Sequence, residues 1–430
     1  MIQPKVLKGF RDSLPRQEII KKEVIATLEK TFSTYGFVPI DTPALEYTEV
    51  LLGKGGGETD KQIFHFLDNG GRDVALRFDL TVPFARFMAT HTHHLQLPFK
   101  RFHVAKVWRG ENPQKGRYRE FFQCDFDIVG IDSLQADVEI VTMIHSALVA
   151  LDVEKFTILL SHRGILNELL ASLGVENHST EILRIIDKIS KIGADAVQEQ
   201  LITLLQDQKT TDTILKYIHS HKDNTPFETL EEMRVLIPSA ETHINHLQQL
   251  LTYVEHLGIE DRFTIDPSIT RGLDYYTGIV YETLLDDLPD IGSICSGGRY
   301  NDLASLYTKQ HLPGVGASIG LDRLLTALEE LDHPLVSELS ASDVIIFNQD
   351  EELSIHYHKT AHLLRKEGIS TLLLLETKKM GPQFKYAQAH HIPYGLYHTE
   401  QGQFTLRHLE SRTDYPHLKL EDVVEHLKRM

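Results

Sequence analysis

The sequence predicts a multidomain α+β protein, and three observations support this fold class. Residues 99–109 and 118–130 alternate apolar and polar side chains with the period of β-strands, and they flank a connector rich in turn residues. They therefore predict an antiparallel hairpin. Residues 165–235 have a polar, helical pattern without strand-like alternation, which predicts an inserted helical subdomain. After residue 342, strand-like and helical runs follow in the order βαβα, which is typical of a separate α/β domain.

The length of the chain fits this division. With 430 residues and 41% hydrophobic content, it can form two or three domains that each have a core. We expect one domain over residues 1–330, which includes the helical insertion, then a linker over 331–342 and a smaller domain over 343–430.

The first domain begins with a helix over residues 16–34, because apolar side chains recur there at helical spacing and Gly36 follows as a stop. Asp132 and Ser133 can cap a second helix that runs to about residue 151. Alternation and turn residues predict the other elements: strands over 63–68, 74–80, 263–269 and 275–285, a glycine turn over 296–303, and a strand running into a helix over 314–331.

Composition excludes several classes of protein. No apolar run approaches the roughly 20 residues that span a bilayer, and the first fifteen residues lack the apolar region of a signal peptide. Two cysteines, Cys124 and Cys295, are too few for a disulfide framework or a cysteine-based zinc site, which fits a reducing compartment. We therefore expect a cytoplasmic protein without a membrane partner.

The net charge of −17 counts against bulk attraction to nucleic acid, so such a partner would have to use local basic patches. The chain also contains 24 histidines. Those at 91–94 and 356–358 lack ligand spacing and an acidic or thiol neighbour in a recognisable pattern, so we interpret them as solvated loop residues and predict no metal site.

One face of the second hairpin strand is unusually polar. Gln123, Asp125 and Asp127 alternate with the apolar residues of the opposite face. The strand alone favours a solvent-exposed sheet face, whereas the tyrosines and arginines elsewhere in the chain favour the floor of a pocket.

Four arginines stand where an anion could be contacted: Arg109, Arg117, Arg271 and Arg323. A guanidinium suits phosphate oxygens because its fork is planar and permanently charged. The Walker-type loop and the GxGxxG fingerprint are both absent. A bound nucleotide would therefore be held by side chains on a sheet.

Together these motifs resemble the histidyl-tRNA synthetases, which are class II aminoacyl-tRNA synthetases. RGENPQKGRYREF followed by QCDFDIVG resembles motif 2, GVGASIGLDRL resembles motif 3, and RGLDYYTGIVYE resembles the family's signature peptide. LRFDLTVPFAR, SGGRYNDL and KGFRDSLP match further blocks in the family's order. The resemblance implies a class II antiparallel sheet flanked by helices, and, more loosely, a C-terminal anticodon-binding domain that carries QFKYAQAHHIPYG.

The resemblance also implies a histidine site. Asp79, Leu80 and Thr81 form the DLT segment, and Asp79 and Thr81 would hold the α-ammonium group together with Gln123. Asp127 would accept a hydrogen bond from the imidazole. Two tyrosines, Tyr275 and Tyr276, would line the ring, and Gly278 would leave room for the ligand. Asp125 has no implied role.

For ATP, the resemblance implies that Arg109 and Arg271 contact the α-phosphate and act as the catalytic residues. Glu111 would accept from the adenine amino group, and Arg117 and Arg323 would hold the outer phosphates, where Mg²⁺ is expected. No protein residue is predicted as a metal ligand.

The implied activity has two steps: L-histidine reacts with ATP to form histidyl-adenylate, and histidine is then transferred to the 3′ end of tRNA(His). Lys115 would lie near the acceptor end of the tRNA, while Lys378, Lys379 and Lys385 are candidates for the anticodon stem; a solvated lysine cluster explains these three equally well. The resemblance also implies a homodimer.

Two other functions stay open. A paralogue of this fold is a noncatalytic subunit of ATP phosphoribosyltransferase, although such proteins typically lose the arginine context of the signature peptide and the C-terminal domain. The fold could also serve as a sensor of uncharged tRNA, which would not need both Arg109 and Arg271.

Overall fold

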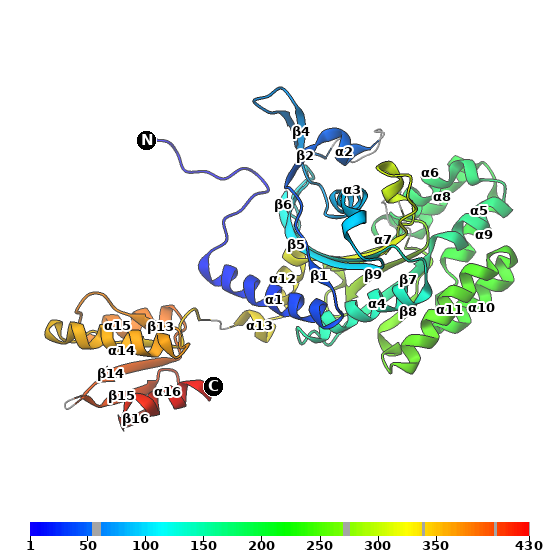
Figure 1. Ribbon diagram of the computed structural model, residues 1–430. Helices are drawn as coiled ribbons and strands as arrows, with labels where there is room; N and C mark the ends of the chain where they lie inside the picture. The colour runs from blue at the N-terminus through cyan, green and yellow to red at the C-terminus, as the bar shows by residue number, and fades with distance from the viewer. Residues whose placement is uncertain (54–61, 270–275, 338–339, 400–401, 430) are drawn as a thin grey trace. The chain divides into compact units, whose positions relative to one another are not determined.

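The computed structural model describes residues 1–53, 62–269, 276–337, 340–399 and 402–429 (Figure 1). These residues divide into two compact units. The first consists of Met1–Asp12 and Val24–Leu331, and the second consists of Ser13–Glu23 and Asp332–Met430.

The first unit is built on one large sheet. Its order, within the described residues, is β1-β5-β6-β11-β10-β9-β7-β8. The strands are β1 (Val38–Pro39), β5 (Phe99–Trp108), β6 (Glu120–Val129), β7 (Phe156–His162), β8 (Phe263–Ile265), β9 (Ile279–Leu285), β10 (Cys295–Arg299) and β11 (Gly314–Gly320). The long middle strands pair antiparallel, and β5 and β6 form the predicted hairpin, with Phe99 opposite Val129 and Trp108 opposite Glu120.

The prediction of a glycine turn over 296–303 is wrong at its first half. Ser296–Arg299 belong to β10, which pairs with both β9 and β11 inside the sheet. A side chain at Gly297 would overlap the carbonyl of Gly316, and one at Gly298 would lie 2.9 Å from the ring of Tyr276. These glycines therefore allow close approach within a strand and do not mark a turn.

Helices cover both faces of the β5–β6 hairpin. On the apolar face, the ring of Phe32 from α1 (Pro15–Thr34) lies 4.9 Å from that of Phe126. On the polar face, Phe84 from α3 (Thr81–His91) lies under the guanidinium of Arg101, at 4.2 Å. The helices α4 (Leu134–Val149), which Ser133 caps as predicted, and α12 (Leu321–Glu330) also pack against β6.

A small sheet precedes α3, with the order β2-β4-β3. Its strands are β2 (Leu45–Tyr47), β3 (His65–Leu67) and β4 (Asp73–Leu76), and α2 (Thr48–Leu52) follows β2. The segment that leaves β4 leads directly into α3, so this sheet delivers residues 77–81 to the polar face of the hairpin.

Between β7 and β8 the chain is helical (Figure 1). This region contains α5 (Arg163–Ser172), α6 (Ser179–Ile186), α7 (Ile189–Ile192), α8 (Ala194–Leu205), α9 (Gln208–Ile218), α10 (Pro226–Leu236) and α11 (Glu241–His256). The helical run therefore continues past residue 235 through α11, which packs on α4 and β7.

The second unit has its own sheet, in the order β13-β12-β14-β15-β16 within the described residues. The strands are β12 (Val344–Ile346), β13 (Thr371–Leu373), β14 (Tyr394–His398), β15 (Phe404–His408) and β16 (Thr413–Leu418). The helices are α13 (Pro334–Ser337), α14 (Ser354–Lys366), α15 (Met380–Ala389) and α16 (Leu420–Lys428). The strand–helix–strand–helix alternation from β12 to α15 makes β12 parallel to both its neighbours, as a crossover requires.

Candidate active site

The polar face of β6 is buried. Gln123, Asp125 and Asp127 are 9%, 1% and 2% exposed. Their register partners on the neighbouring strands share the same face of the sheet, and these include Arg101 on β5 and Ser318 on β11. The solvent-exposed interpretation of this strand is therefore wrong. We call Asp79, Arg101, Gln123, Asp125 and Asp127 the polar floor.

Asp127 is held by two side chains. Its Oδ2 lies 2.6 Å from Nη2 of the buried Arg101, and its Oδ1 accepts a hydrogen bond from the hydroxyl of Tyr300. Burial raises the pKa of Asp127, while Arg101 and Tyr300 act in the opposite direction. Gly316 lies opposite in the sheet, and a side chain there would overlap the carboxylate.

Arg101 and Tyr300 were missed by the sequence analysis. Arg101 could have been found, because the alternation of β5 puts it on the same face as its antiparallel partner Asp127. Tyr300 directly follows β10, the strand that brings it to the floor. Because residues 296–303 were predicted to form a turn, this strand was not predicted.

The DLT segment reaches the same place from the other direction. Oδ1 of Asp79 accepts a hydrogen bond from the backbone N–H of Val82 at 3.0 Å, which holds the first turn of α3. Burial raises the pKa of Asp79, and the Val82 amide and Arg109 lower it. The next residue, Leu80, is fully buried, whereas Thr81 is partly exposed at the start of α3.

Asp79 also contributes to the raised pKa of Asp125 and of Asp127, because like charges oppose ionisation. The structure therefore brings Asp79, Gln123 and Asp127 into one buried group, with the partly exposed Thr81 at its edge.

Arg109 joins this group at the end of β5. Its Nε donates to the carbonyl of Phe78 at 3.2 Å, and its guanidinium lies over the rings of Phe78 and Phe121, at 4.4 and 5.2 Å. Stacking against two rings fixes the plane of the guanidinium beside Asp79. Arg109 is therefore placed between the floor and the loop that follows it.

That loop and the start of α12 form the rim of the site, which we define as Glu111, Lys115, Arg117 and Arg323. Gly116 has a φ of +67°, and a Cβ there would lie 3.5 Å from Cγ of Arg323. The loop thus packs on the start of α12 and brings Arg117 near Arg323. Glu111 is partly exposed, and its backbone carbonyl accepts from Nε of Arg119 at 3.0 Å.

Two residues outside the predicted site hold the rim in place. Asp322 pairs with Arg11 at 2.5 Å and accepts from the backbone N–H of Phe122 at 2.7 Å. The guanidinium of Arg11 also lies 3.9 Å over the ring of Tyr118. The carboxylate next to Arg323 therefore ties α12, β6 and the N-terminal segment together.

The signature peptide is only partly described. Arg271 and Tyr275 lie outside the described residues. Tyr276 packs with Ala85, Tyr300 and Leu303, so it lies beside the residue that contacts Asp127.

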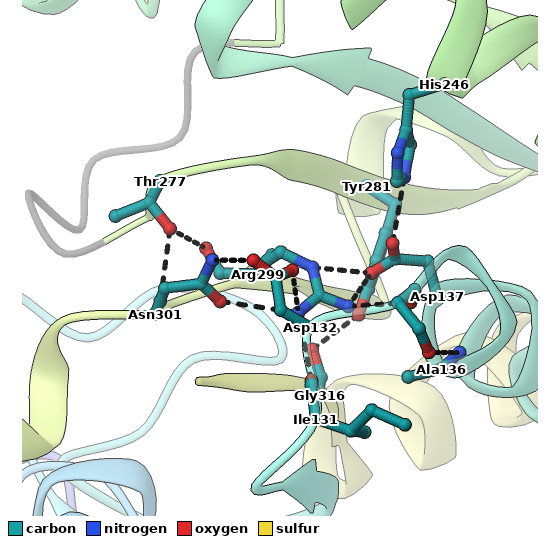
Figure 2. Close-up of polar contacts among 11 residues, drawn as sticks. Ile131, Asp132, Ala136, Asp137, His246, Thr277, Tyr281, Arg299, Asn301 and Gly316 are labelled. Atoms are coloured by element: carbon teal, nitrogen blue, oxygen red, sulfur yellow. Dashed lines mark hydrogen bonds and ion pairs between the residues drawn. The ribbon is translucent and has the colours of Figure 1, made fainter. Parts of the chain in front are cut away.

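Arg299 anchors the chain that follows Tyr276 (Figure 2). Its carbonyl accepts from the backbone N–H of Thr277 at 2.8 Å, and its guanidinium makes a buried ion pair with Asp137 at 2.7 Å. His246 from α11 contacts the other carboxylate oxygen of Asp137 at 2.8 Å. A Cβ at Gly278 would lie 3.1 Å from Cδ of Arg299. This glycine therefore makes room for Arg299, and its expected place beside a ligand stays a prediction.

Comparisons with known proteins agree with this geometry. The family described as Histidyl-tRNA synthetase matches residues 9–324, and the family described as Anticodon binding domain matches residues 343–430. The chain belongs to the histidyl-tRNA synthetase family. It is 51% identical to a histidine–tRNA ligase from Treponema denticola, over 92% of this chain and 89% of the relative. It is 48% identical to one from Rhodopirellula baltica, over 90% and 88%.

Solved structures show the same fold. The crystal structure of histidyl-tRNA synthetase from Nostoc sp. PCC 7120 superposes with a TM-score of 0.89 at 31% identity, and the match covers all of both chains. A Bacillus halodurans protein, described as an ATP phosphoribosyltransferase regulatory subunit/histidyl-tRNA synthetase, has a TM-score of 0.76 at 23% identity, over 92% and 98% of the two chains. At that identity the likeness concerns the fold alone.

Four lysines of this synthetase were predicted to contact tRNA. Lys115 is exposed at the rim and pairs with Glu330. In the second unit, Lys378 and Lys379 are exposed just before α15 and Lys385 is exposed within it, and Lys378 pairs with Glu376 at 2.7 Å. Among the helices in the described part of the chain, none has the length and apolar character that a membrane crossing requires.

Proposed function

We propose that this protein activates L-histidine with ATP and transfers the histidyl group to the 3′ end of tRNA(His). The observation that carries the proposal is the buried polar floor in a chain of the histidyl-tRNA synthetase family. A floor of carboxylates and an amide suits a ligand with several N–H donors, because an unpaired buried acceptor costs free energy.

In this proposal the floor binds histidine. Asp79, Thr81 and Gln123 hold the α-ammonium group, and Asp127 accepts a hydrogen bond from the imidazole. Asp127 remains able to do so while it contacts Arg101 and Tyr300, since two carboxylate oxygens offer about four acceptor positions. Tyr276 and Tyr275 enclose the ring. A pocket that pairs with both polar ends of the substrate rejects apolar competitors strongly.

ATP lies against Arg109 and the rim. Arg109 and Arg271 bind the α-phosphate, Glu111 accepts from the adenine amino group, and Arg117 and Arg323 hold the outer phosphates. The histidine carboxylate attacks the α-phosphorus and pyrophosphate leaves. The protein contributes alignment of the two reactants and fixed positive charge where negative charge develops.

Mg²⁺ is proposed to bind together with ATP. The described residues contain no group of three or more histidine, cysteine, aspartate or glutamate side chains placed to hold a metal ion. Mg²⁺ commonly takes only one or two protein carboxylates. We therefore propose that phosphate oxygens and water hold most of the ion's coordination positions. When bound, the ion neutralises part of the charge on the outer phosphates.

The second step uses the lysines. Lys115 contacts the acceptor end of the tRNA, and Lys378, Lys379 and Lys385 contact the anticodon stem. Phosphate contacts of this kind make affinity fall as salt rises. A homodimer and a cytoplasmic location complete the proposal.

The decisive experiment is pyrophosphate exchange with each amino acid in turn, followed by aminoacylation of total tRNA. Exchange is expected with histidine alone, and charging is expected for tRNA(His). Protein that binds ATP but gives no exchange with histidine would end the proposal. Exchange without charging would instead point to a histidine-activating protein with another acceptor.

A further inference from the structure

Asp125 is a buried member of the polar floor that the proposed function does not use. It lies on β6 between Gln123 and Asp127, and its register partners are His103 on β5 and Ser318 on β11. A buried carboxyl group without a structural partner is expensive to retain. Its contacts therefore indicate what could compensate it.

Ser318 supplies one of those contacts. Its hydroxyl accepts from Nε2 of Gln123 at 2.8 Å, and its place opposite Asp125 in the sheet lowers the pKa of that carboxyl group. A hydroxyl has a single hydrogen, so it cannot satisfy both oxygens of Asp125. Two acceptors remain, Oε1 of Gln123 and Oδ1 of Asp125, and both are buried without a hydrogen-bond partner among the described residues.

The contacts of the neighbouring arginines go to other acceptors. The ion pair of Arg101 goes to Asp127, and Arg77 donates to the backbone carbonyls of Thr42 and Lys106, at 2.6 and 2.8 Å. Among the described residues, Asp125 has no ion-pair partner within 4.0 Å. The titratable and charged groups that face it from the packed elements are Arg101 and His103 on β5, Asp127 on β6, and Arg77 and Asp79 before α3.

Burial without a direct counter-charge affects the acid strength of Asp125. The pKa of Asp125 is raised to about 7: desolvation by burial is the largest cause, Asp127 and Asp79 also raise the pKa, and Arg101 and Ser318 lower it. Near neutral pH the group is therefore close to half ionised, and a cation placed against it would favour the ionised form.

We propose that Asp125 is a further substrate-binding residue, whose Oδ1 receives an N–H of the amino acid's α-ammonium group together with Oε1 of Gln123. An ammonium nitrogen carries three hydrogens, so two of them can serve these acceptors while the third is donated to Asp79 or Thr81. Each imidazole nitrogen carries at most one, so the ring cannot do this. The proposal rests on the proposed function, because histidine must be the substrate.

The test compares three probes that differ in the ammonium group. Histidine and histidinol carry it, and 3-(imidazol-4-yl)propanoate lacks it. The variants are Asp125→Asn and Asp125→Ser. Glu120→Gln is the matched control. It removes a carboxylate from the same strand, but one that already accepts hydrogen bonds from Lys106 and Trp108. The measurements are the KM for histidine and for ATP in pyrophosphate exchange, and the competitive inhibition constants of the other two probes.

Both Asp125 variants are expected to raise the KM for histidine and the inhibition constant of histidinol at least about tenfold, the loss of one charge-assisted hydrogen bond. The constant for the deaminated probe and the KM for ATP should stay within about twofold, as should every constant of Glu120→Gln. An equal loss for the deaminated probe, or an unchanged KM for histidine, overturns the proposal.

Failure of the proposed function would give a different result: the wild-type protein itself would show no pyrophosphate exchange with histidine. If neither variant folds, calorimetry on the wild-type protein replaces them, in buffers of different ionisation enthalpy at pH 7. After subtraction of the protons that each free ligand's own imidazole loses, histidine binding should release protons that binding of the deaminated probe does not, because the ammonium group drives Asp125 to ionise. Equal proton release by the two ligands after this subtraction would overturn the proposal.

Discussion

The polar floor and the rim of the site both carry charged side chains, but their environments differ. The floor residues Asp79, Arg101, Asp125 and Asp127 are at most 5% exposed, and desolvation is the largest cause of the pKa shift of each of its carboxyl groups. In the rim, Arg117 is exposed, and the ion pair of Lys115 with Glu330 is open to solvent.

This difference teaches where charge can be removed without loss of structure. Exposed ion pairs contribute little because water and salt screen them. A buried pair such as Arg101 with Asp127 contributes specificity, and the loss of one member leaves the other charge unpaired in a low-dielectric environment. Floor variants should therefore affect both folding and histidine binding, whereas rim variants should affect ATP or tRNA binding alone.

The largest effect is expected for a residue that contacts the reacting phosphate. Arg271→Ala should lower the rate of adenylate formation about 10³-fold or more, because a fixed guanidinium stabilises charge that develops at the α-phosphate. Pyrophosphate exchange measures the rate, and circular dichroism controls for folding. Near-normal exchange in a folded variant would contradict the role proposed for Arg271.

The comparison between floor and rim is tested most directly by Asp127→Ala. It leaves the fully buried guanidinium of Arg101 without its ion-pair partner, so we expect a loss of about 3–5 kcal/mol in stability. Differential scanning calorimetry should show this as a lower melting temperature for the first unit. Lys115→Ala is the matched change in the rim and should leave that temperature unchanged. A similar melting temperature for both variants would break the distinction.

A pH series on Asp125→Asn sharpens the same comparison. The pKa of Asp125 is about 7 in the folded protein, against 3.8 when exposed, so the folded state binds an extra proton between these values. Stability from the protonated group is present below pH 4 and is lost as pH rises through 7. The variant should therefore match wild type near pH 4 and exceed it by up to about 4 kcal/mol near pH 8. A melting-temperature difference that stays constant with pH would contradict this expectation.

The smallest effects belong to the rim. Arg117→Ala should raise the KM for ATP about tenfold with an unchanged KM for histidine, since it removes one exposed contact to an outer phosphate. Lys115→Ala should weaken tRNA binding only a few fold and reduce the salt dependence by about one phosphate contact. Steady-state kinetics and a salt titration of tRNA affinity measure these effects. A larger loss of melting temperature in Arg117→Ala than in Asp127→Ala would reverse the proposed order.

Local patterns predicted a large part of the fold. The alternation in residues 99–109 and 118–130 predicted the hairpin of β5 and β6, because a period of two is an intrinsic property of a strand. Ser133 marked the start of α4. The same patterns misassigned β10, because its glycines resemble a turn when the strands on either side are not in view.

The sequence by itself determined which residues share a face of β6, and its motifs indicated the family. Only the tertiary structure decided that this face is buried, that Asp127 pairs with Arg101 and Tyr300, and that Gly278 makes room for Arg299. Burial depends on what packs over a strand. Here α3 and the residue after β10 pack over the polar face, and both are distant from β6 in the sequence. No local pattern in β6 could therefore predict that this face is buried.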